Sequence, residues 1–274
     1  MVSAHRPTHA LRHLVKYYYQ VEGNFTSLVA LQPVPARSPE ILEFMFATPY
    51  IVERLHHGTT ARCCDVALVG MKTHRHVNLY MRDRVDAFTI AFQPGGLLAL
   101  LGIPSCELTD GDCDARDAVG REIDVLRERL AGKTTIAERA RIADEYLCAR
   151  LAGGTDASPV ILAARLLHRC LGSVQITQLA ERTSLGVRHF ERRFVREIGM
   201  PPKLYARIVR FESALRLKSL NPSSRWTDIA YRLGYCDHMH MIHDFKRLSG
   251  NTPTGIIDQL DMFVKPEVEL HRQA

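Results

Sequence analysis

From residue 160 onward, hydrophobic residues recur every three or four positions, a spacing that predicts amphipathic helices. Two short helices separated by a tight turn are predicted within 176–194, and the same arrangement recurs within 226–245. Each pair has the pattern of a helix-turn-helix, whose second helix can enter a DNA major groove. A single pattern of this kind is a common false match, whereas two in tandem are much harder to obtain by chance.

The earlier part of the chain mixes strand-like and helical patterns, so the whole chain is predicted to be α+β. Short strand-like runs are predicted at 41–46, 66–71, 77–81 and 87–92. Helical stretches are predicted at 97–101, 115–130 and 136–151. Small and polar residues at 152–159 are typical of a linker. The expected parts are therefore a first domain at 1–151, the linker at 152–159, a helical domain at 160–260 and a C-terminal tail at 261–274.

The second helix of the first pair is predicted to have a hydrophobic face and a charged face. Phe190 and Phe194 are four residues apart and would anchor this helix to the preceding one. Arginine matches the guanine edge, and glutamate can accept a hydrogen bond from cytosine N4. The residues of the outward stripe would read bases, and arginines beside it would contact phosphates. The candidate DNA contacts are Val187, Arg188, His189, Glu191, Arg192, Arg193 and Arg196.

A long helix is predicted between the two pairs, at 203–220. The sequence Gly199-Met200-Pro201-Pro202 would end one helix and start this one, because proline is tolerated in the first helical turn. A helix of some 20 residues is roughly 30 Å long. That length is close to the ~34 Å between successive major-groove faces of DNA. The long helix could therefore hold two DNA-reading helices on one side of a duplex.

The second helix of the second pair begins after Asp237, a good N-cap residue. Met241, Phe245 and Leu248 would form its buried stripe. The outward residues, which are less polar than those of the first pair, are His238, Met239, Ile242 and His243, with Lys246 and Arg247 placed to contact phosphates. The histidines also allow a metal site, but Cys236 is the sole acidic or thiol ligand evident nearby, so no metal is predicted.

Positive charge is concentrated in the helical region. Residues 160–260 hold 16 Lys and Arg against 8 Asp and Glu, whereas the rest of the chain holds 20 against 22. A basic segment beside a nearly neutral one indicates a polyanionic partner, although a solvated basic surface would give the same balance. No apolar run approaches the roughly 20 residues of a membrane span. The N-terminus lacks the apolar core of an export signal, so a cytoplasmic protein with reduced thiols is expected. A redox pair formed by Cys63 and Cys64 is a weak alternative.

The segment 160–260 resembles the AraC/XylS family of transcription regulators. The resemblance is carried by Leu179, Ala180, 190–194, Gly199, Pro202, Tyr205, 207–210, Ala214, Ile229, Ala230, Gly234, Tyr235, Asp237, Phe245, Lys246, Gly250 and Pro253. It implies that Arg188, Glu191 and Arg192 read one major groove, and that the outward residues of the second pair read the next.

The chain departs from this family at three positions in or beside its two DNA-reading helices. Gly186 stands where the family usually has a serine cap, Met241 where it has an aromatic residue and His243 where it has an arginine. Gly186 should cap the first DNA-reading helix somewhat less well than serine. Met241 and His243 predict weaker DNA binding by the second pair, or a pH-sensitive contact if His243 titrates.

The N-terminal part is similar to the sensor-like domain of one AraC subgroup, through three short segments at 92–96, 100–104 and 107–110. The similarity implies a small cupin-like β-barrel with packed helices. Such a domain would serve as an effector pocket, a dimerisation surface or both. The effector and the residues that would bind it are not identified by the sequence.

The predicted function is that of a sequence-specific DNA-binding transcription regulator controlled by a small molecule, not that of an enzyme. One alternative is a cupin-type metal-dependent enzyme with a basic helical appendage, suggested by His74 and His76 beside predicted strands. That metal set lacks a nearby glutamate, and no cofactor is predicted. Another alternative is a ligand-independent DNA binder. The expected partners are double-stranded DNA, an unknown effector, RNA polymerase if the protein activates transcription, and a second copy in a homodimer, with no membrane.

Overall fold

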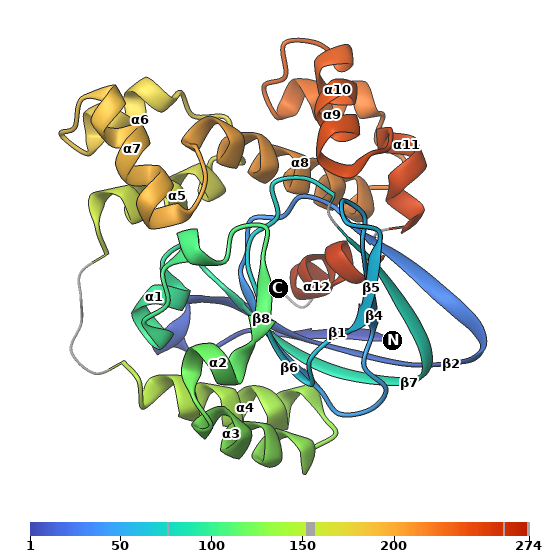
Figure 1. The fold of residues 1–274 in the computed structure, drawn as a ribbon. Helices are drawn as coiled ribbons and strands as arrows, with labels where there is room; N and C mark the ends of the chain where they lie inside the picture. Colours follow the sequence, from blue (N-terminus) through green and yellow to red (C-terminus); the bar gives the residue numbers. More distant parts are fainter. Residues whose placement is uncertain (76, 152–156, 260, 273–274) are drawn as a thin grey trace.

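An antiparallel sheet forms the first half of the chain, and a set of helices lies across one end of it (Figure 1). The computed structural model describes residues 1–75, 77–151, 157–259 and 261–272. The strands are β1 Val2–His5, β2 Val15–Val34, β3 Ile41–Met45, β4 Ile51–Arg54, β5 Thr59–Arg62, β6 Val66–Val69, β7 Val77–Phe92 and β8 Asp112–Asp114. Their main order is β1-β2-β7-β3-β6-β8, and β4 joins β7 to β5, so the sheet curls into an open, barrel-like form.

Two long strands organise this sheet. β7 pairs with β2 along most of its length, with β3 through its second half and with β4 through its first half. The runs at 77–81 and 87–92 are therefore one strand, and the prediction of two was wrong. Their polar connection at 82–84 stays in the strand because β2 pairs with it, with Asp83 opposite Phe25 and Arg84 opposite Asn24. The predicted runs at 41–46 and 66–71 are confirmed as β3 and β6.

Helices cover the outer face of this sheet. They are η1 His9–Leu11, α1 Gly96–Leu101, η2 Ser105–Glu107, α2 Ala115–Val119, α3 Glu122–Ala131 and α4 Ile136–Cys148. The single helix expected at 115–130 is divided into α2 and α3, because Gly120 adopts a positive φ of 92° that ends a helix. Leu126, Leu130 and Leu147 bury against the sheet. A buried ion pair at 2.6 Å between Arg139 and Asp86 joins α4 to β7.

The rest of the described chain is helical, as predicted. Its elements are α5 Pro159–Arg169, α6 Ile176–Arg182, α7 Val187–Ile198, α8 Pro202–Leu220, α9 Trp226–Arg232, α10 His238–Ser249, α11 Pro253–Ile256, η3 Ile257–Gln259 and α12 Asp261–Arg272. One hydrophobic core runs along α8 and includes Phe194, Phe211 and Phe245. Among the described residues, no helix has the length and apolar character needed to cross a membrane. Residues 152–156 of the expected linker lie outside the described residues.

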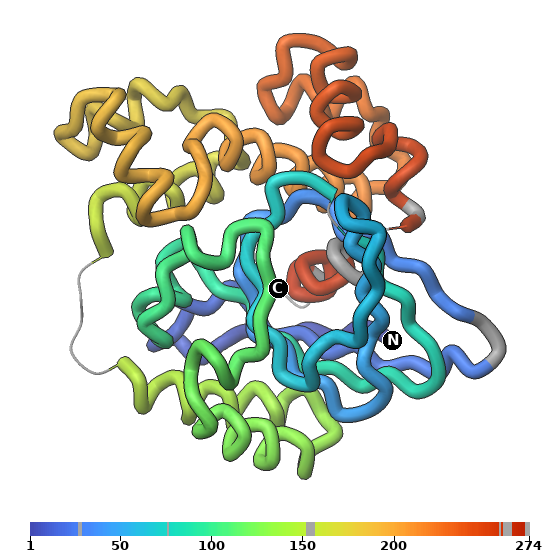
Figure 2. The backbone as a smooth tube through the Cα atoms, in the orientation of Figure 1, coloured from blue at the N-terminus to red at the C-terminus, as the bar shows by residue number. Residues whose placement is uncertain are grey.

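The C-terminal segment returns to the N-terminal domain (Figure 2). Residues 261–272, expected as a tail, form α12, which packs against β1, β2 and α8. Leu270 joins the core of the sheet, and Glu267 forms ion pairs with Lys16 at 2.5 Å and with Arg216 at 3.5 Å. The helix therefore connects the first and last parts of the chain.

The seven cysteines are all free thiols. Cys63 and Cys64 are not bonded to each other, and burial raises the pKa of the Cys63 thiol to about 12. A raised pKa disfavours the thiolate that redox exchange requires. The structure therefore gives the alternative of a redox pair no support.

Candidate nucleic-acid interface

The first helix-turn-helix unit consists of α6 and α7. Phe190 and Phe194 of α7 are fully buried, with ring centroids 5.5 Å apart, in a core that also contains Leu179 and Ala180 of α6. This packing fixes which face of α7 points outward. Gly186 is the N-cap of α7 and provides no side-chain hydrogen bond, in contrast to the serine usual in the family.

The outward face of α7 carries the residues predicted to contact DNA. Arg188, His189, Arg192 and Arg196 are exposed, Val187 is also exposed, and Glu191 is half-buried. Arg193 is half-buried and forms an ion pair with Glu197 at 2.8 Å, so its guanidinium is partly engaged within the helix. The predicted set therefore shares one accessible surface, with Arg193 at its edge.

The second unit consists of α9 and α10. Asp237 caps α10 as predicted, because its carboxylate accepts a hydrogen bond from the backbone N–H of His240 at 2.7 Å. Met241, Phe245 and Leu248 are fully buried, which confirms the predicted stripe. The Phe245 ring lies 4.7 Å from that of Phe211 on α8.

The outward face of α10 is less polar than that of α7. Met239 is 58% exposed. His243, Lys246 and Arg247 are exposed, whereas His238 and Ile242 are half-buried. The His240 ring packs edge-on against the Tyr235 ring, with centroids 5.6 Å apart. This surface offers contacts to thymine methyl groups and phosphates more than hydrogen bonds to base edges.

The connecting helix α8 holds both units, one near each end (Figure 1). At the first unit, the Tyr205 ring lies 5.6 Å from Phe194. At the second, Arg207 donates to the buried carboxylate of Asp244, from Nε at 2.9 Å and from Nη2 at 2.5 Å. Sequence reasoning missed this ion pair. The sequence does contain one sign of it, because Asp244 lies within the hydrophobic stripe of a helix, where an unpaired charge would be costly.

The N-terminal domain contacts the ends of both DNA-reading helices, α7 and α10. Thr109 donates from its hydroxyl to the carbonyl of Gly199, the residue that ends α7, at 3.1 Å. Ala36 donates from its backbone N–H to the carbonyl of Leu248, in the last turn of α10, at 2.8 Å. The orientation of both helices is therefore tied to the domain that precedes them.

The histidine-rich segments contain candidate metal ligands. Within the described part of the chain, no group of three His, Cys, Asp or Glu side chains is arranged to hold a metal ion. His74 is hydrogen-bonded to Thr73 through Nδ1 at 2.9 Å. His76, its expected partner in the alternative metal site, lies outside the described residues.

Two helix-turn-helix units fixed at the two ends of one helix, behind an open barrel-like domain, define a DNA-binding regulator. Residues 179–259 match a family described as a helix-turn-helix domain, and residues 3–114 match a domain of unknown function (DUF6597). No curated protein sequence matches the chain.

Solved structures of ToxT from Vibrio cholerae share the fold of nearly the whole chain. ToxT from strain O395 superposes with a TM-score of 0.51 and 9% identity, over 89% of this chain and 98% of that chain. An apo form of a single-substitution variant of ToxT from strain SCE256 gives a TM-score of 0.53 and 10% identity, over 89% and 97%. The chain therefore contains a helix-turn-helix domain and shares the fold of ToxT, both of which agree with the resemblance of residues 160–260 to the AraC/XylS family.

Proposed function

We propose that this chain recognises specific DNA sequences by inserting α7 and α10 into successive major grooves on one face of a duplex. The observation that carries the proposal is the pairing of two outward-facing helices with one connecting helix of 19 residues. At 1.5 Å per residue, α8 is roughly 28 Å long, close to the ~34 Å repeat of the groove.

The two helices would contribute differently to binding. Arg188 and Arg192 carry planar guanidinium groups that can donate two hydrogen bonds to guanine, so α7 would supply most of the sequence preference. Lys246 and Arg247 on α10 would neutralise phosphates, a contribution that adds affinity and salt dependence without reading sequence. The basic balance of residues 160–260 supports this assignment.

We also propose a division of labour along the chain. Residues 160–260 would bind DNA, and residues 1–151, followed by a linker at 152–159, would bind a small effector or a second copy of the chain. An effector can act only if it binds the DNA-competent arrangement with a different affinity from other arrangements. The contacts of Thr109 and Ala36 with the ends of α7 and α10 supply a route for that difference. If the protein activates transcription, RNA polymerase is a further partner.

The test is selection of bound sequences from a random duplex library, followed by affinity measurements on the selected site. Arg188→Ala and Arg192→Ala should each cost about 1–3 kcal/mol, roughly 5- to 150-fold in Kd, and relax specificity at one base pair. Arg62→Ala, an exposed arginine on β5, serves as the control and should leave Kd unchanged. Failure to select any sequence, or wild-type affinity and specificity in both α7 variants, would refute the proposal.

A further inference from the structure

The two helix-turn-helix units meet through their turns, beside the first half of α8. Gly172 and Ser173 belong to the turn that precedes α6, and Gly234 belongs to the turn between α9 and α10. A Cβ added to Gly234 would lie 3.8 Å from the Cβ of Ser173. The turn before α6 also packs on α8, where a Cβ added to Gly172 would lie 2.3 Å from the carbonyl oxygen of Ala206. The units are therefore in direct contact as well as joined by one helix.

One side chain of α8, that of Arg210, contacts both turns. Its Nη2 donates a hydrogen bond to the carbonyl of Gly172 at 3.2 Å. Its guanidinium carbon lies 5.0 Å from the centroid of the Tyr235 ring, within the range of a cation–π contact. Arg210 is half-buried, so its guanidinium is partly shielded from water, which strengthens both contacts. A single residue therefore joins the first unit, the connecting helix and the second unit.

The acceptor in the first unit is held in a fixed place. Gly172 has a φ of 77°, a conformation that favours glycine, and an added Cβ would lie 3.0 Å from the backbone nitrogen of Arg210. The N–H of Gly172 donates to the carbonyl of Leu167 in α5 at 2.8 Å. Such a close approach of two backbones leaves the Gly172 carbonyl little freedom to move relative to α8. The hydrogen bond from Arg210 therefore has a defined length and direction.

The partner in the second unit is the ring of Tyr235, which is 6% exposed. On α10, the His240 ring packs edge-on against it, and His240 is the third residue of that helix. Among the described residues, the Tyr235 hydroxyl has no hydrogen-bond partner. The ring and not the hydroxyl therefore carries the contact with Arg210, and this contact extends through His240 to the start of α10.

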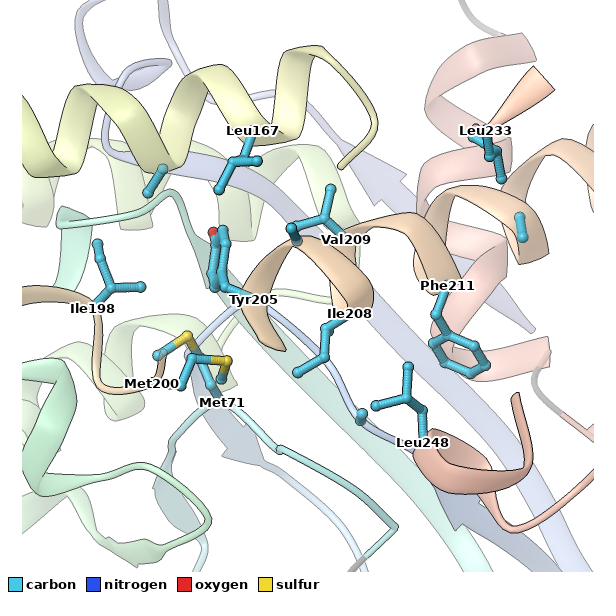
Figure 3. Close-up of a cluster of buried hydrophobic side chains, with 14 of the residues drawn as sticks. Met71, Leu167, Ile198, Met200, Tyr205, Ile208, Val209, Phe211, Leu233 and Leu248 are labelled. Atoms are coloured by element: carbon cyan, nitrogen blue, oxygen red, sulfur yellow. The ribbon is translucent and has the colours of Figure 1, made fainter. Parts of the chain in front are cut away.

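Apolar packing brings the two units together but does not by itself fix their orientation. Leu167 of α5, Val209 of α8 and Leu233 after α9 belong to one hydrophobic core that spans both units (Figure 3). The hydrophobic effect is non-directional, whereas a hydrogen bond weakens steeply as its angle departs from the preferred one. The directional contacts of Arg210 thus select one relative orientation among those that the core allows.

This orientation matters because spacing on DNA combines a distance with a rotation. One helical turn of ~34 Å holds about 10–10.5 base pairs, so one extra base pair moves a contact by roughly 3.4 Å and rotates it by roughly 35°. Two rigidly joined helices cannot follow that change without losing contacts, whereas two loosely joined helices can. A rigid joint between the units is therefore measurable as a preference for one spacing.

We propose that Arg210 is a positioning residue that sets the distance and rotation between α7 and α10, and thereby determines which spacing of base-pair contacts the protein accepts. Its guanidinium acts through the two turns and does not touch the duplex. This inference rests on the proposed function, since a spacing preference has meaning only if both helices bind one duplex.

The test measures Kd of the full-length protein for its selected site and for versions with one base pair inserted or deleted between the two contacted segments. The wild type should bind both altered sites at least about tenfold more weakly than the selected one. Arg210→Lys keeps the charge, but a compact ammonium cannot reproduce the planar fork and the stacking, so this ratio should fall to about threefold or less. A loss of folded protein alone would raise all three Kd values by one factor and leave the ratio unchanged.

Three further variants isolate the contact. Tyr235→Leu removes the ring and should lower the ratio as Arg210→Lys does. Tyr235→Phe keeps the ring and should retain the wild-type ratio. Lys203→Gln removes an exposed charge from the same helix and should also retain it.

A measurement without DNA tests the same contact. In urea unfolding, a double-mutant cycle of Arg210→Met and Tyr235→Leu should give a coupling of about two- to fivefold in the unfolding constant. The inference is overturned if the cycle is additive, if the wild type accepts all three spacings equally, or if Arg210→Lys keeps the wild-type ratio. Those results leave the proposed function standing, whereas a protein that selects no duplex refutes the proposed function and this inference with it.

Discussion

Replacing Arg207 with methionine should destabilise the second helix-turn-helix unit by leaving a buried charge unpaired. The carboxylate of Asp244 is 1% exposed, and its Oδ1 accepts both hydrogen bonds that Arg207 donates from α8. Among the described residues, Asp244 Oδ2 has no hydrogen-bond partner. Methionine keeps much of the arginine side chain's volume and packing but removes its charge. The carboxylate of α10 would then have no cation to offset its burial.

The size of the effect follows from the burial of the two partners. Removing one member of a buried ion pair costs about 3–5 kcal/mol. The Arg207 side chain is 26% exposed, so water can reach the vacated position, and the lower end of that range, about 3 kcal/mol, is expected. For a chain of this size, each kcal/mol lowers Tm by about 2–4 °C, which predicts a decrease of about 6–12 °C.

Thermal unfolding of three variants tests this prediction. Lys203→Met removes an exposed charge from the same helix and should change Tm by no more than a degree or two. Arg207→Met combined with Asp244→Leu should recover much of the stability lost in Arg207→Met, because no buried charge remains. The reasoning is refuted if Arg207→Met behaves like Lys203→Met, or if the double variant is less stable than Arg207→Met alone.

Two further substitutions test other parts of the structure. Burial raises the pKa of Glu40 from 4.5 to about 7. The buried ionised carboxylate therefore lowers the free energy of unfolding above pH 7, and this loss of stability disappears as the pH falls toward 4.5. Glu40→Gln should therefore stabilise by about 3 kcal/mol in urea unfolding at pH 8 and by little at pH 4.5, and an equal gain at both values would contradict this. Gly199 has a φ of 88°, and an added Cβ would lie 2.3 Å from the Thr109 hydroxyl, so Gly199→Ala should weaken the contact between α7 and the N-terminal domain. Gly102 also has a positive φ, of 73°, but an added Cβ there would meet no other atom, so Gly102→Ala measures the backbone strain alone, about 1–2 kcal/mol. Gly199→Ala should lower the free energy of unfolding by more than Gly102→Ala does.

The helical half of the fold could be predicted because its pattern is local. Phe190 and Phe194 are one turn apart, so the sequence alone indicates which face of α7 is buried. Asp237 is followed directly by the helix that it caps, and this too is a local signal. The outward position of Arg188 then follows from the geometry of the helix. The structure agrees with each of these expectations.

The sheet was harder to predict because its strands depend on their partners. β2 runs through polar residues such as Glu22, Asn24 and Gln32, which interrupt the expected alternation but pair with β7. The segment 261–272, expected as a tail, forms α12 although Pro266 lies within it and proline is unfavourable inside an isolated helix. Contacts with β1, β2 and α8 compensate for this cost.

The parts of the candidate sites that were missed depend on long-range contacts. Arg210 meets Gly172 and Tyr235 only after the two helix-turn-helix units have packed together, and a single sequence gives no sign of these contacts. Asp244 pairs with Arg207 across two helices. A polar residue in a hydrophobic stripe indicates that a partner exists, but it does not indicate which residue the partner is.

Hydroxyl-radical footprinting of the full-length protein on its selected site tests the central claim most directly. Two protected regions should appear about one helical turn, 10–10.5 base pairs, apart on the same face of the duplex. Arg192→Ala should weaken one of these regions and leave the other in place. A single protected region, or two regions on opposite faces of the duplex, would contradict the account in which α8 holds α7 and α10 in successive major grooves.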